Sequence, residues 1–257
     1  MCAPQIAVAS DSVVDRETRF ASARGDDGRQ ALGALCDRIS ERQLPQIAHG
    51  RRAIILLEGP EGAAKKHALK QLVRAFDPCH LGVHATGFDR REANDGHWLA
   101  RFWRQLPSAG NTAIFFRSWY RRVLDDRVLG RTVEDSVPRV FDEINEFEAQ
   151  QRDYGTLLVK LYFDVSADVQ EQRLAQRRQS PWRTRASTDD FIRADDPAYQ
   201  HALTEVRTHT DTRWSPWRTI DGDDDEQAAL AALEAVAEAW TKAMPAEPPK
   251  LVSPRVA

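Results

Sequence analysis

The 257-residue sequence predicts an α/β protein built around a doubly wound parallel β-sheet. Short apolar segments recur along the chain and alternate with segments whose apolar residues are spaced for a helix, the pattern of a parallel sheet covered by helices. The first such segment, AIILLE at 53–58, is mostly apolar, as expected for a strand buried on both faces. A chain of this length can bury one large core, so a single domain is expected over residues 30–244.

Each element follows from its own spacing. Residues 32–44 predict a helix packed outside the core, and Leu69, Leu72, Val73 and Phe76 predict a helix after the first strand, since they recur at i, i+3, i+4 and i+7. Further strands are predicted at 80–87, 112–116, 156–166 and 217–222, and a closing helix at 226–240, capped by the acidic residues 221–226. Residues 1–29 and the proline-rich residues 245–257 are expected to be a flexible N-terminal arm and C-terminal tail.

Composition indicates an ordinary soluble protein. Hydrophobic residues make up 42% of the chain, charged residues 29%, and the formal net charge is −3, which indicates neither a nucleic-acid partner nor a membrane partner. The three cysteines, Cys2, Cys36 and Cys79, lack the paired spacing of a zinc site. No apolar run has the length of a membrane span and the first residues do not form a convincing signal peptide, so a cytoplasmic location is expected.

The segment after the first strand, GPEGAAKK at 59–66, matches part of a phosphate-binding loop. In the pattern G-x-x-x-x-G-K-[ST], the glycines let backbone N–H groups surround phosphate oxygens, and the lysine reaches the outer phosphates. Gly59 and Lys65 hold their places, whereas Ala64 replaces the second glycine and Lys66 the hydroxyl residue. On this string alone, a phosphate cradle and a plain left-handed turn followed by solvated lysines are equally supported.

A second segment favours the phosphate cradle. The string FFRSWYRRVLDDRVLG at 115–130 places Ser118, Trp119 and Tyr120 between arginines at the end of a predicted buried strand. Packing alone does not explain arginines at such a position, because they need anionic partners there.

These motifs resemble the polyphosphate kinase 2 family, which reads G-x-D-x-A-G-K-G in its loop and D-R-S-W-Y-N-R at the later strand end. The resemblance continues in register over roughly residues 44–240 and includes a basic segment, QEQRLAQRRQSPWR at 170–183. It implies a phosphate-loop kinase-like fold with helices on both faces of the sheet and a basic helical lid at about 170–195. It also implies transfer of phosphate between polyphosphate and a nucleoside mono- or diphosphate, with Mg²⁺ or Mn²⁺, in a homodimer or homotetramer.

The resemblance assigns roles to individual residues. Lys65, Glu61, Arg117 and Arg122 would be catalytic. An active enzyme would need Glu61 to hold the metal, alone or together with Glu58 or Asp89. The loop residues expected to bind phosphate are Gly59, Gly62, Ala64, Lys65 and Lys66. The residues expected to bind polyphosphate from the lid are Lys160, Arg173, Arg177, Arg178 and Arg183.

Two departures from the family pattern bear on catalysis. Phe116 stands where the family has an aspartate, and offers no oxygen to a metal or a nucleophile. Ala64 adds a Cβ where the backbone should approach phosphate. The double phenylalanine is similar to the less conventional half of the family's tandem two-domain polyphosphate:AMP phosphotransferases. A catalytically impaired homologue that binds polyphosphate or nucleotide without transferring phosphate is therefore the alternative to an active enzyme; a kinase using ATP is a weaker third reading.

Overall fold

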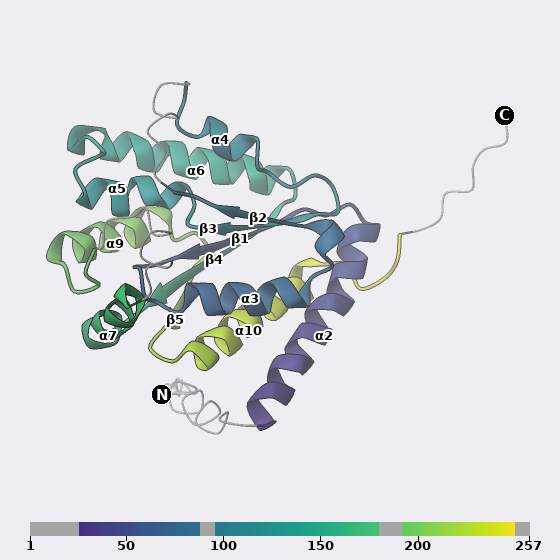
Figure 1. Cartoon of the computed structure of the whole chain (residues 1–257). Helices are drawn as coiled ribbons and strands as arrows, with labels where there is room; N and C mark the ends of the chain where they lie inside the picture. Colours follow the sequence, from purple (N-terminus) through teal and green to yellow (C-terminus); the bar gives the residue numbers. More distant parts are fainter. Residues whose placement is uncertain (1–25, 88–95, 180–191, 250–257) are drawn as a thin grey trace, which may run out of the picture.

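A computed structural model of the chain describes residues 26–87, 96–179 and 192–249 (Figure 1). Residues 1–25 of the predicted arm, residues 250–257 of the predicted tail, the candidate metal ligand Asp89 and the candidate lid residue Arg183 lie outside the described residues. Within the described ranges, no helix combines the length and the apolar character that crossing a membrane requires.

Five parallel strands form one sheet in the described structure, in the order β2-β3-β1-β4-β5 (Figure 1). Their bounds are β1 Ala53–Glu58, β2 Leu81–Ala85, β3 Thr112–Phe116, β4 Leu157–Asp164 and β5 Trp217–Asp221. Each strand lies within a segment that the sequence predicts, so the prediction of a parallel α/β fold is confirmed. Leu57 pairs with Phe116 and Glu58 with Tyr162, which brings the carboxyl ends of β1, β3 and β4 to one edge.

Helices cover both faces of this sheet, as predicted. The α-helices are α2 Asp26–Ala48, α3 Lys65–Ala75, α4 Ala100–Trp103, α5 Asp125–Val128, α6 Val137–Asp153, α7 Ala167–Arg178, α9 Pro197–Thr210 and α10 Asp225–Ala243. Short 3₁₀ turns are η1 Pro78–His80, η3 Trp119–Arg122 and η4 Glu134–Ser136.

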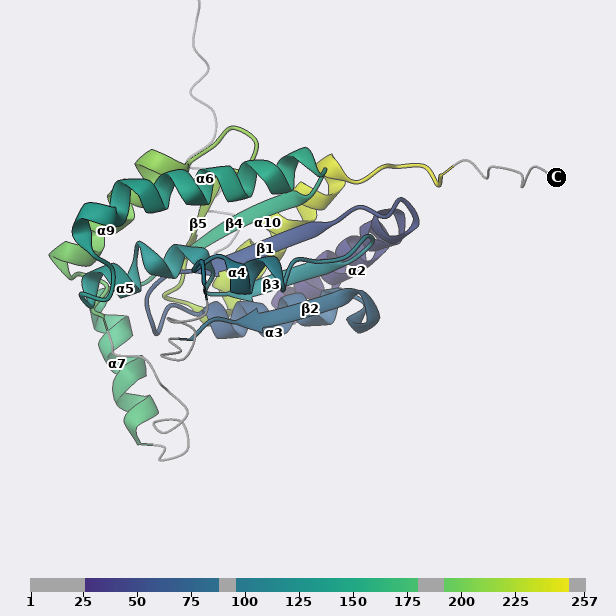
Figure 2. The ribbon, with the colours of Figure 1, turned by 90° about the horizontal axis from the view of Figure 1, so that it is seen from above.

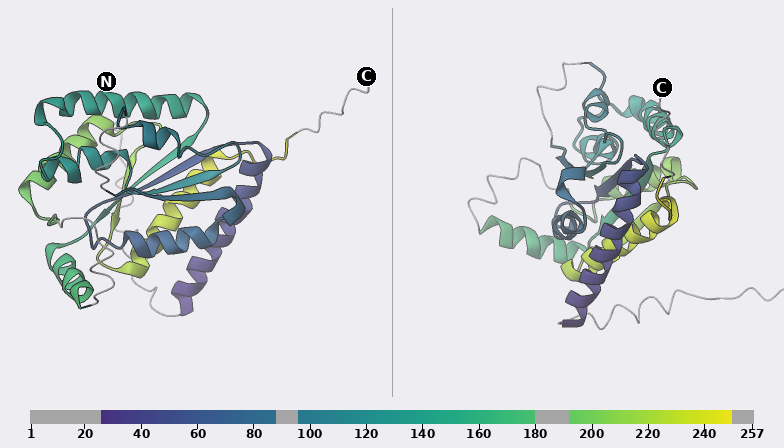
Figure 3. Two further views of the ribbon diagram at one scale, coloured as in Figure 1. Left: turned by 45° about the horizontal axis from the view of Figure 1, so that its top comes forward. Right: turned by 90° about the vertical axis from the view of Figure 1, so that its right-hand side faces the viewer.

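The alternation of side chains along β1 divides the core into two parts. Ile55 and Leu57 pack with α2, α3 and α10 on one face, while Ile54 and Leu56 pack with α4, α6 and α9 on the other. The two helical layers are visible on either side of the sheet in Figure 1 and in the left view of Figure 3. All four β1 side chains are fully buried, which explains why this strand is apolar throughout and not alternating.

Helix α2 is longer and more deeply packed than expected. It begins at Asp26, inside the predicted arm, and continues through Pro45 to Ala48. The prediction that this helix lies outside the core is wrong, because Ile39 is fully buried in the core cluster. The buried Gln46 also joins the helix to the sheet and to α10, since its side chain hydrogen-bonds to Thr112 and accepts from Trp240 Nε1 at 2.9 Å.

Two helices begin at the carboxyl edge of the sheet. The acidic residues before α10 cap it as predicted, because the Asp224 carboxylate accepts hydrogen bonds from the backbone N–H groups of Glu226 and Gln227. Helix α7, the described part of the predicted lid, begins after Ser166, whose hydroxyl accepts from Val169 N. Figure 2 shows α7 extending from this edge away from the body of the protein.

Candidate active site

The loop between β1 and α3 turns through three residues with positive φ angles, Gly59, Gly62 and Ala64. Gly59 and Gly62 have φ angles of +131° and +91°, which side-chain-bearing residues rarely adopt. A Cβ on Gly59 would lie 2.1 Å from the Phe163 carbonyl oxygen of β4, so this close approach requires glycine. Ala64 keeps a left-handed φ of +39° even though it is not glycine. The replacement therefore adds a methyl group without changing the sense of the turn.

Lys65 occupies the first position of α3 and turns back over the loop. Its ammonium donates hydrogen bonds to the Pro60 carbonyl at 2.6 Å and to the Gly59 carbonyl. Only 3% of the residue is exposed, and this burial, together with Arg117, lowers the pKa of Lys65 to about 8 despite the opposing effect of nearby carboxylates. The lysine is thus held at the loop by carbonyl oxygens that a phosphate oxygen could replace.

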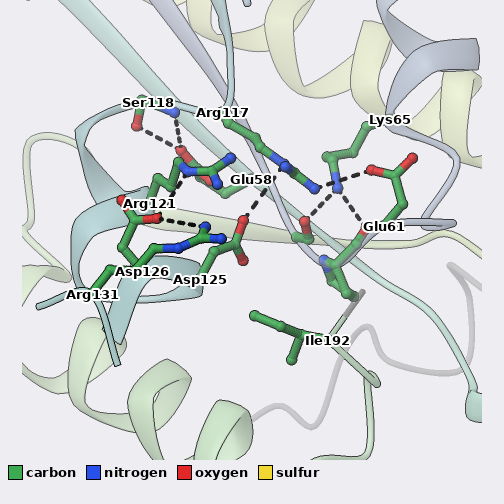
Figure 4. A network of polar contacts seen from close by, with 12 residues as sticks. Glu58, Glu61, Lys65, Arg117, Ser118, Arg121, Asp125, Asp126, Arg131 and Ile192 are labelled. Atoms are coloured by element: carbon green, nitrogen blue, oxygen red, sulfur yellow. Dashed lines mark hydrogen bonds and ion pairs between the residues drawn. The ribbon is translucent and has the colours of Figure 1, made fainter. Parts of the chain in front are cut away.

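Arg117 lies immediately beyond β3 and reaches the same place (Figure 4). Its φ of +61° is unusual for a residue with a side chain, and its N–H donates to the Leu57 carbonyl at 3.1 Å. The guanidinium lies 3.0 Å from Glu61 and 3.6 Å from Asp125. This backbone turn brings the arginine from the end of β3 to the loop that follows β1.

Glu61 is held between two arginines. One carboxylate oxygen pairs with Arg117 and the other with Arg177 of α7. Burial alone would raise the pKa of Glu61, but Lys65, Arg117 and Arg177 outweigh it and lower the pKa. The loop carboxylate is therefore ionised and engaged with cationic side chains.

Glu58, at the end of β1, joins the two strand ends. Its carboxylate accepts hydrogen bonds from the Ser118 backbone N–H and hydroxyl, both at 2.6 Å (Figure 4). Burial raises the pKa of Glu58 to about 7, and the nearby Asp125 adds to this rise. The serine of the Ser-Trp-Tyr motif thus holds the strand ends together.

The aromatic side chains of the motif point toward α6 and not toward the loop. Trp119 Nε1 and Tyr120 Oη donate to one carboxylate oxygen of Glu148 on α6, at 3.0 and 2.7 Å. Lys160 of β4 donates to the other oxygen at 3.1 Å and to the Thr210 carbonyl at 2.7 Å. The prediction that Lys160 binds polyphosphate from the lid is wrong, because its side chain is fully buried in this network. Trp119 and Tyr120 therefore anchor the site to α6.

Comparisons with known proteins identify the family of this chain. The family model for Polyphosphate kinase 2 (PPK2) matches residues 22–248. The chain belongs to the polyphosphate kinase 2 family. It is 31% identical over 220 residues to a polyphosphate:AMP phosphotransferase of Pseudomonas syringae pv. tomato, covering 85% of this chain and 44% of that protein. An ADP-polyphosphate phosphotransferase 2 of Rhizobium meliloti is 27% identical over 80% of this chain and 68% of its own length.

A solved structure of a polyphosphate kinase 2 from Arthrobacter aurescens TC1 has a similar fold. Its TM-score is 0.78 at 25% identity, covering 95% of this chain and 90% of that one. The putative polyphosphate kinase 2 of Pseudomonas aeruginosa PA01 gives a TM-score of 0.77 over 86% of this chain and 48% of its own. The chain thus spans less than half the length of some relatives and nearly the whole length of another.

The other predicted residues of this polyphosphate kinase 2 homologue are spread more widely. Arg122 stacks over the Trp98 ring at 5.1 Å from its centroid. Lys66 and Arg178 are exposed on α3 and α7. Arg173 contacts the loop through backbone carbonyls. The catalytic role of Arg122, the phosphate-binding role of Lys66 and the polyphosphate-binding roles of Arg173 and Arg178 stay predictions.

Phe116, the residue at the family's aspartate position, packs against the core beside Lys65. Its ring centroid lies 5.9 Å from the lysine ammonium, and the side chain is only partly buried.

The motif analysis missed one carboxylate of the site, that of Asp125, which lies beside Arg117 with only 9% exposure. Burial raises the pKa of Asp125 against the lowering influence of Arg117 and Arg121. The pair of acidic residues at 125–126 among arginines was its signal in the sequence.

The carboxylate oxygens of Glu61 and Glu58 already have partners within the protein and do not form a metal site in this arrangement. Both oxygens of Glu61, the predicted metal ligand, face arginines, and the second candidate, Glu58, accepts two hydrogen bonds from Ser118. Among the residues that the structure describes, no group of three or more His, Cys, Asp or Glu side chains could hold a metal ion. The described side chains therefore do not fit a metal held by protein ligands alone.

Proposed function

We propose that this chain transfers a phosphoryl group between polyphosphate and a nucleoside mono- or diphosphate. The observation that carries the proposal is the cationic centre at the loop, where Lys65, Arg117 and Arg177 meet at the carboxyl edge of a parallel sheet. Ligands of such sheets bind at this edge, and phosphoryl transfer depends mainly on positioning and on neutralising phosphate charge. Family membership supports the same substrates, because relatives are named as polyphosphate:AMP and ADP-polyphosphate phosphotransferases.

In the proposed reaction, a terminal phosphate oxygen of the nucleotide attacks the terminal phosphorus of polyphosphate. A new P–O bond forms, the bridging P–O bond breaks, and the shortened polyphosphate leaves with that electron pair. The nucleotide gains one phosphate, and the reverse reaction lengthens polyphosphate. Lys65 would contact the transferred group, and Arg117 would balance the charge that develops on its oxygens.

Three features support the binding part of the proposal. The loop N-terminal to α3 favours an anion through its backbone dipoles. Lys65 is held over that loop by carbonyl oxygens. The exposed Arg178 and the partly exposed Arg177 continue the positive charge along α7, where a long polyanion could lie. A requirement for Mg²⁺ or Mn²⁺ and a homo-oligomeric state remain predictions.

The test is nucleotide formation by the purified protein. Long-chain polyphosphate and either Mg²⁺ or Mn²⁺ are supplied with AMP, ADP, GMP or GDP in turn, and a parallel reaction contains a chelator. We expect product that depends on the divalent cation and is lost in Lys65→Ala. Lys70→Ala, which removes an exposed lysine from the same helix, is the matched control and should keep the activity.

Two results would overturn the proposal. Equal product from wild type and Lys65→Ala would indicate a contaminating kinase. No product with any acceptor, combined with polyphosphate binding that Lys65→Ala weakens, would favour the alternative of a binding protein that does not transfer phosphate.

A further inference from the structure

Four successive carbonyl groups of the phosphate loop accept hydrogen bonds from side chains. Lys65 donates to those of Gly59 and Pro60. The next two are contacted from α7, where Gln170 Nε2 donates to the Glu61 carbonyl at 2.9 Å and Arg173 Nη1 to the Gly62 carbonyl at 2.7 Å. Side-chain donors thus contact each carbonyl group of the loop from residue 59 to residue 62, and those of Glu61 and Gly62 are held from α7.

Both the nitrogen and the oxygen of the Gln170 side-chain amide form hydrogen bonds. Nε2 donates a second hydrogen bond to the Ile192 carbonyl at 3.0 Å, and Oε1 accepts one from the Ala194 N–H at 2.8 Å. Only one orientation of the amide satisfies two carbonyls and one N–H group, and the residue is 2% exposed. Gln170 therefore connects the loop, the start of α7 and the segment that precedes α9.

Arg173 connects the loop to the turn that follows β5, the strand at the edge of the sheet. Besides the Gly62 carbonyl, its guanidinium donates to the Gly222 carbonyl at 2.5 Å and the Asp223 carbonyl at 2.7 Å, and it lies 3.0 Å from the Asp225 carboxylate. These groups lie in the turn between β5 and α10 and at the first residue of α10. Several of the guanidinium donors are therefore already used within the protein, which leaves few to contact polyphosphate.

Packing reinforces these hydrogen bonds. A Cβ on Gly62 would lie 3.3 Å from Gln170 Cγ, and one on Gly222 would lie 2.4 Å from the Asp164 carbonyl oxygen and 3.3 Å from the Ala63 carbonyl carbon. The loop is thus enclosed between α7 and the β5–α10 turn. A phosphate loop presents its N–H groups to the ligand, so the α7 donors that hold the Glu61 and Gly62 carbonyl groups favour the binding conformation.

We propose that Gln170 and Arg173 are positioning residues, which hold the phosphate loop and, through it, Lys65 in the conformation that receives phosphate. The inference rests on the proposed function in taking phosphate as the ligand of the loop. It assigns α7 a second role, because Gln170 and Arg173 hold the backbone of the loop, whereas Arg177, on the same face of the helix, pairs with a carboxylate that phosphate can replace.

Amide hydrogen exchange tests this directly. Gln170→Glu replaces the two donors of the amide by an acceptor and should speed exchange in residues 59–67 by about tenfold or more, with no change in α10. Gln172→Glu, the same substitution at an exposed position of α7, is the matched control and should leave the loop unchanged. Arg173→Lys is a second variant, because lysine has one nitrogen in place of Nη1, which contacts the Gly62 and Gly222 carbonyls, and Nη2, which contacts Asp223 and Asp225.

Binding and rate measurements separate positioning from general stability. We expect weaker binding of inorganic tripolyphosphate in Gln170→Glu and Arg173→Lys, and a kcat lowered by about tenfold or more with a nearly unchanged KM for the nucleotide. A role limited to stability would lower the unfolding temperature and leave the kcat of the folded protein unchanged. Loop exchange equal to wild type in both folded variants would overturn the inference. If the wild type makes no nucleotide, the proposed function fails, whereas exchange and tripolyphosphate binding still decide the role of Gln170 and Arg173.

Discussion

The ammonium nitrogen of Lys160 lies 3.1 Å from a carboxylate oxygen of Glu148, and both side chains are fully buried. The same carboxylate accepts hydrogen bonds from Trp119 and Tyr120, the two residues that follow Ser118 at the end of β3. Because Ser118 is in turn bound to Glu58, this pair supports the strand ends that carry the site. The ion pair is part of the framework beneath the phosphate loop.

Removal of Lys160 should therefore destabilise the protein more than it changes ligand contacts. In Lys160→Met, Glu148 stays buried without its cationic partner, and we expect the free energy of unfolding to fall by about 3–5 kcal/mol. Urea denaturation measures the loss. Lys70→Met, at an exposed position of α3, is the control and should change it by less than about 0.5 kcal/mol. If Lys160→Met kept full stability but bound polyphosphate more weakly, Lys160 would instead be a ligand-binding residue.

Glu58 should make stability depend on pH. Its pKa is about 7 in the folded protein against 4.5 as the ordinary value, so the folded state binds the proton more tightly than the unfolded state. The stability that this proton provides is fully present below pH 4.5 and is lost as the pH rises to about 7. In Glu58→Gln the side chain is neutral at every pH, and its amide oxygen can still accept the hydrogen bonds of Ser118. We expect the variant to gain stability relative to wild type between pH 5 and pH 8, as measured by urea denaturation. A constant difference over this range would contradict the assigned shift.

Phe116→Asp tests whether the site lacks only a carboxylate. The new side chain would lie beside Lys65, raise the pKa of that lysine and offer oxygens near the loop. We expect faster nucleotide formation, with a stability loss of about 1–3 kcal/mol because a partly buried ring is removed. The control is Phe116→Asn, because asparagine has nearly the same size as aspartate but no charge. This variant should show the same stability loss as Phe116→Asp without the gain in rate. Equal rates in the two variants would mean that charge at this position is not what limits transfer.

Ala64 should carry backbone strain that glycine relieves. Its φ of +39° costs a residue with a Cβ about 1 kcal/mol, so Ala64→Gly is expected to be neutral or stabilising by up to about 1 kcal/mol. The control is Ala63→Gly, because this change removes a buried methyl group from a residue whose φ angle is not positive. Thermal unfolding of the two variants measures the difference. A larger loss in Ala64→Gly than in Ala63→Gly would show that the alanine methyl group stabilises the loop.

Local sequence was sufficient for the five strands of the sheet, whereas α6 and α9 were not predicted. The strands at 53–58 and 112–116 coincide with β1 and β3, because a continuous apolar run of this length fits a strand buried on both faces. Helix α2 was harder to place, since its burial depends on contacts of Ile39 and Gln46 with the sheet and α10, which lie far away in the sequence.

The loop and its lysine could be assigned from the sequence only together with the Ser-Trp-Tyr segment at 115–130, because GPEGAAKK alone fits a plain turn equally well. Glu148 was missed, although it follows Ile144 by four residues on the apolar face of α6, where a buried charge needs partners. Lys160 was assigned to the wrong environment for the same reason, since sequence alone does not show which charges meet in the interior.

The sequence by itself determined the α/β class, the order of the strands along the chain and the position of the phosphate loop, because hydrophobic spacing and glycine conformation act locally. The tertiary structure decided which charged side chains reach that loop. Arg117 does so through a left-handed turn, Arg177 and Gln170 through the packing of α7, and Lys160 is kept away by its burial against Glu148. These outcomes depend on distances between residues separated by many positions, and such distances exist only once the sheet has brought the strand ends together.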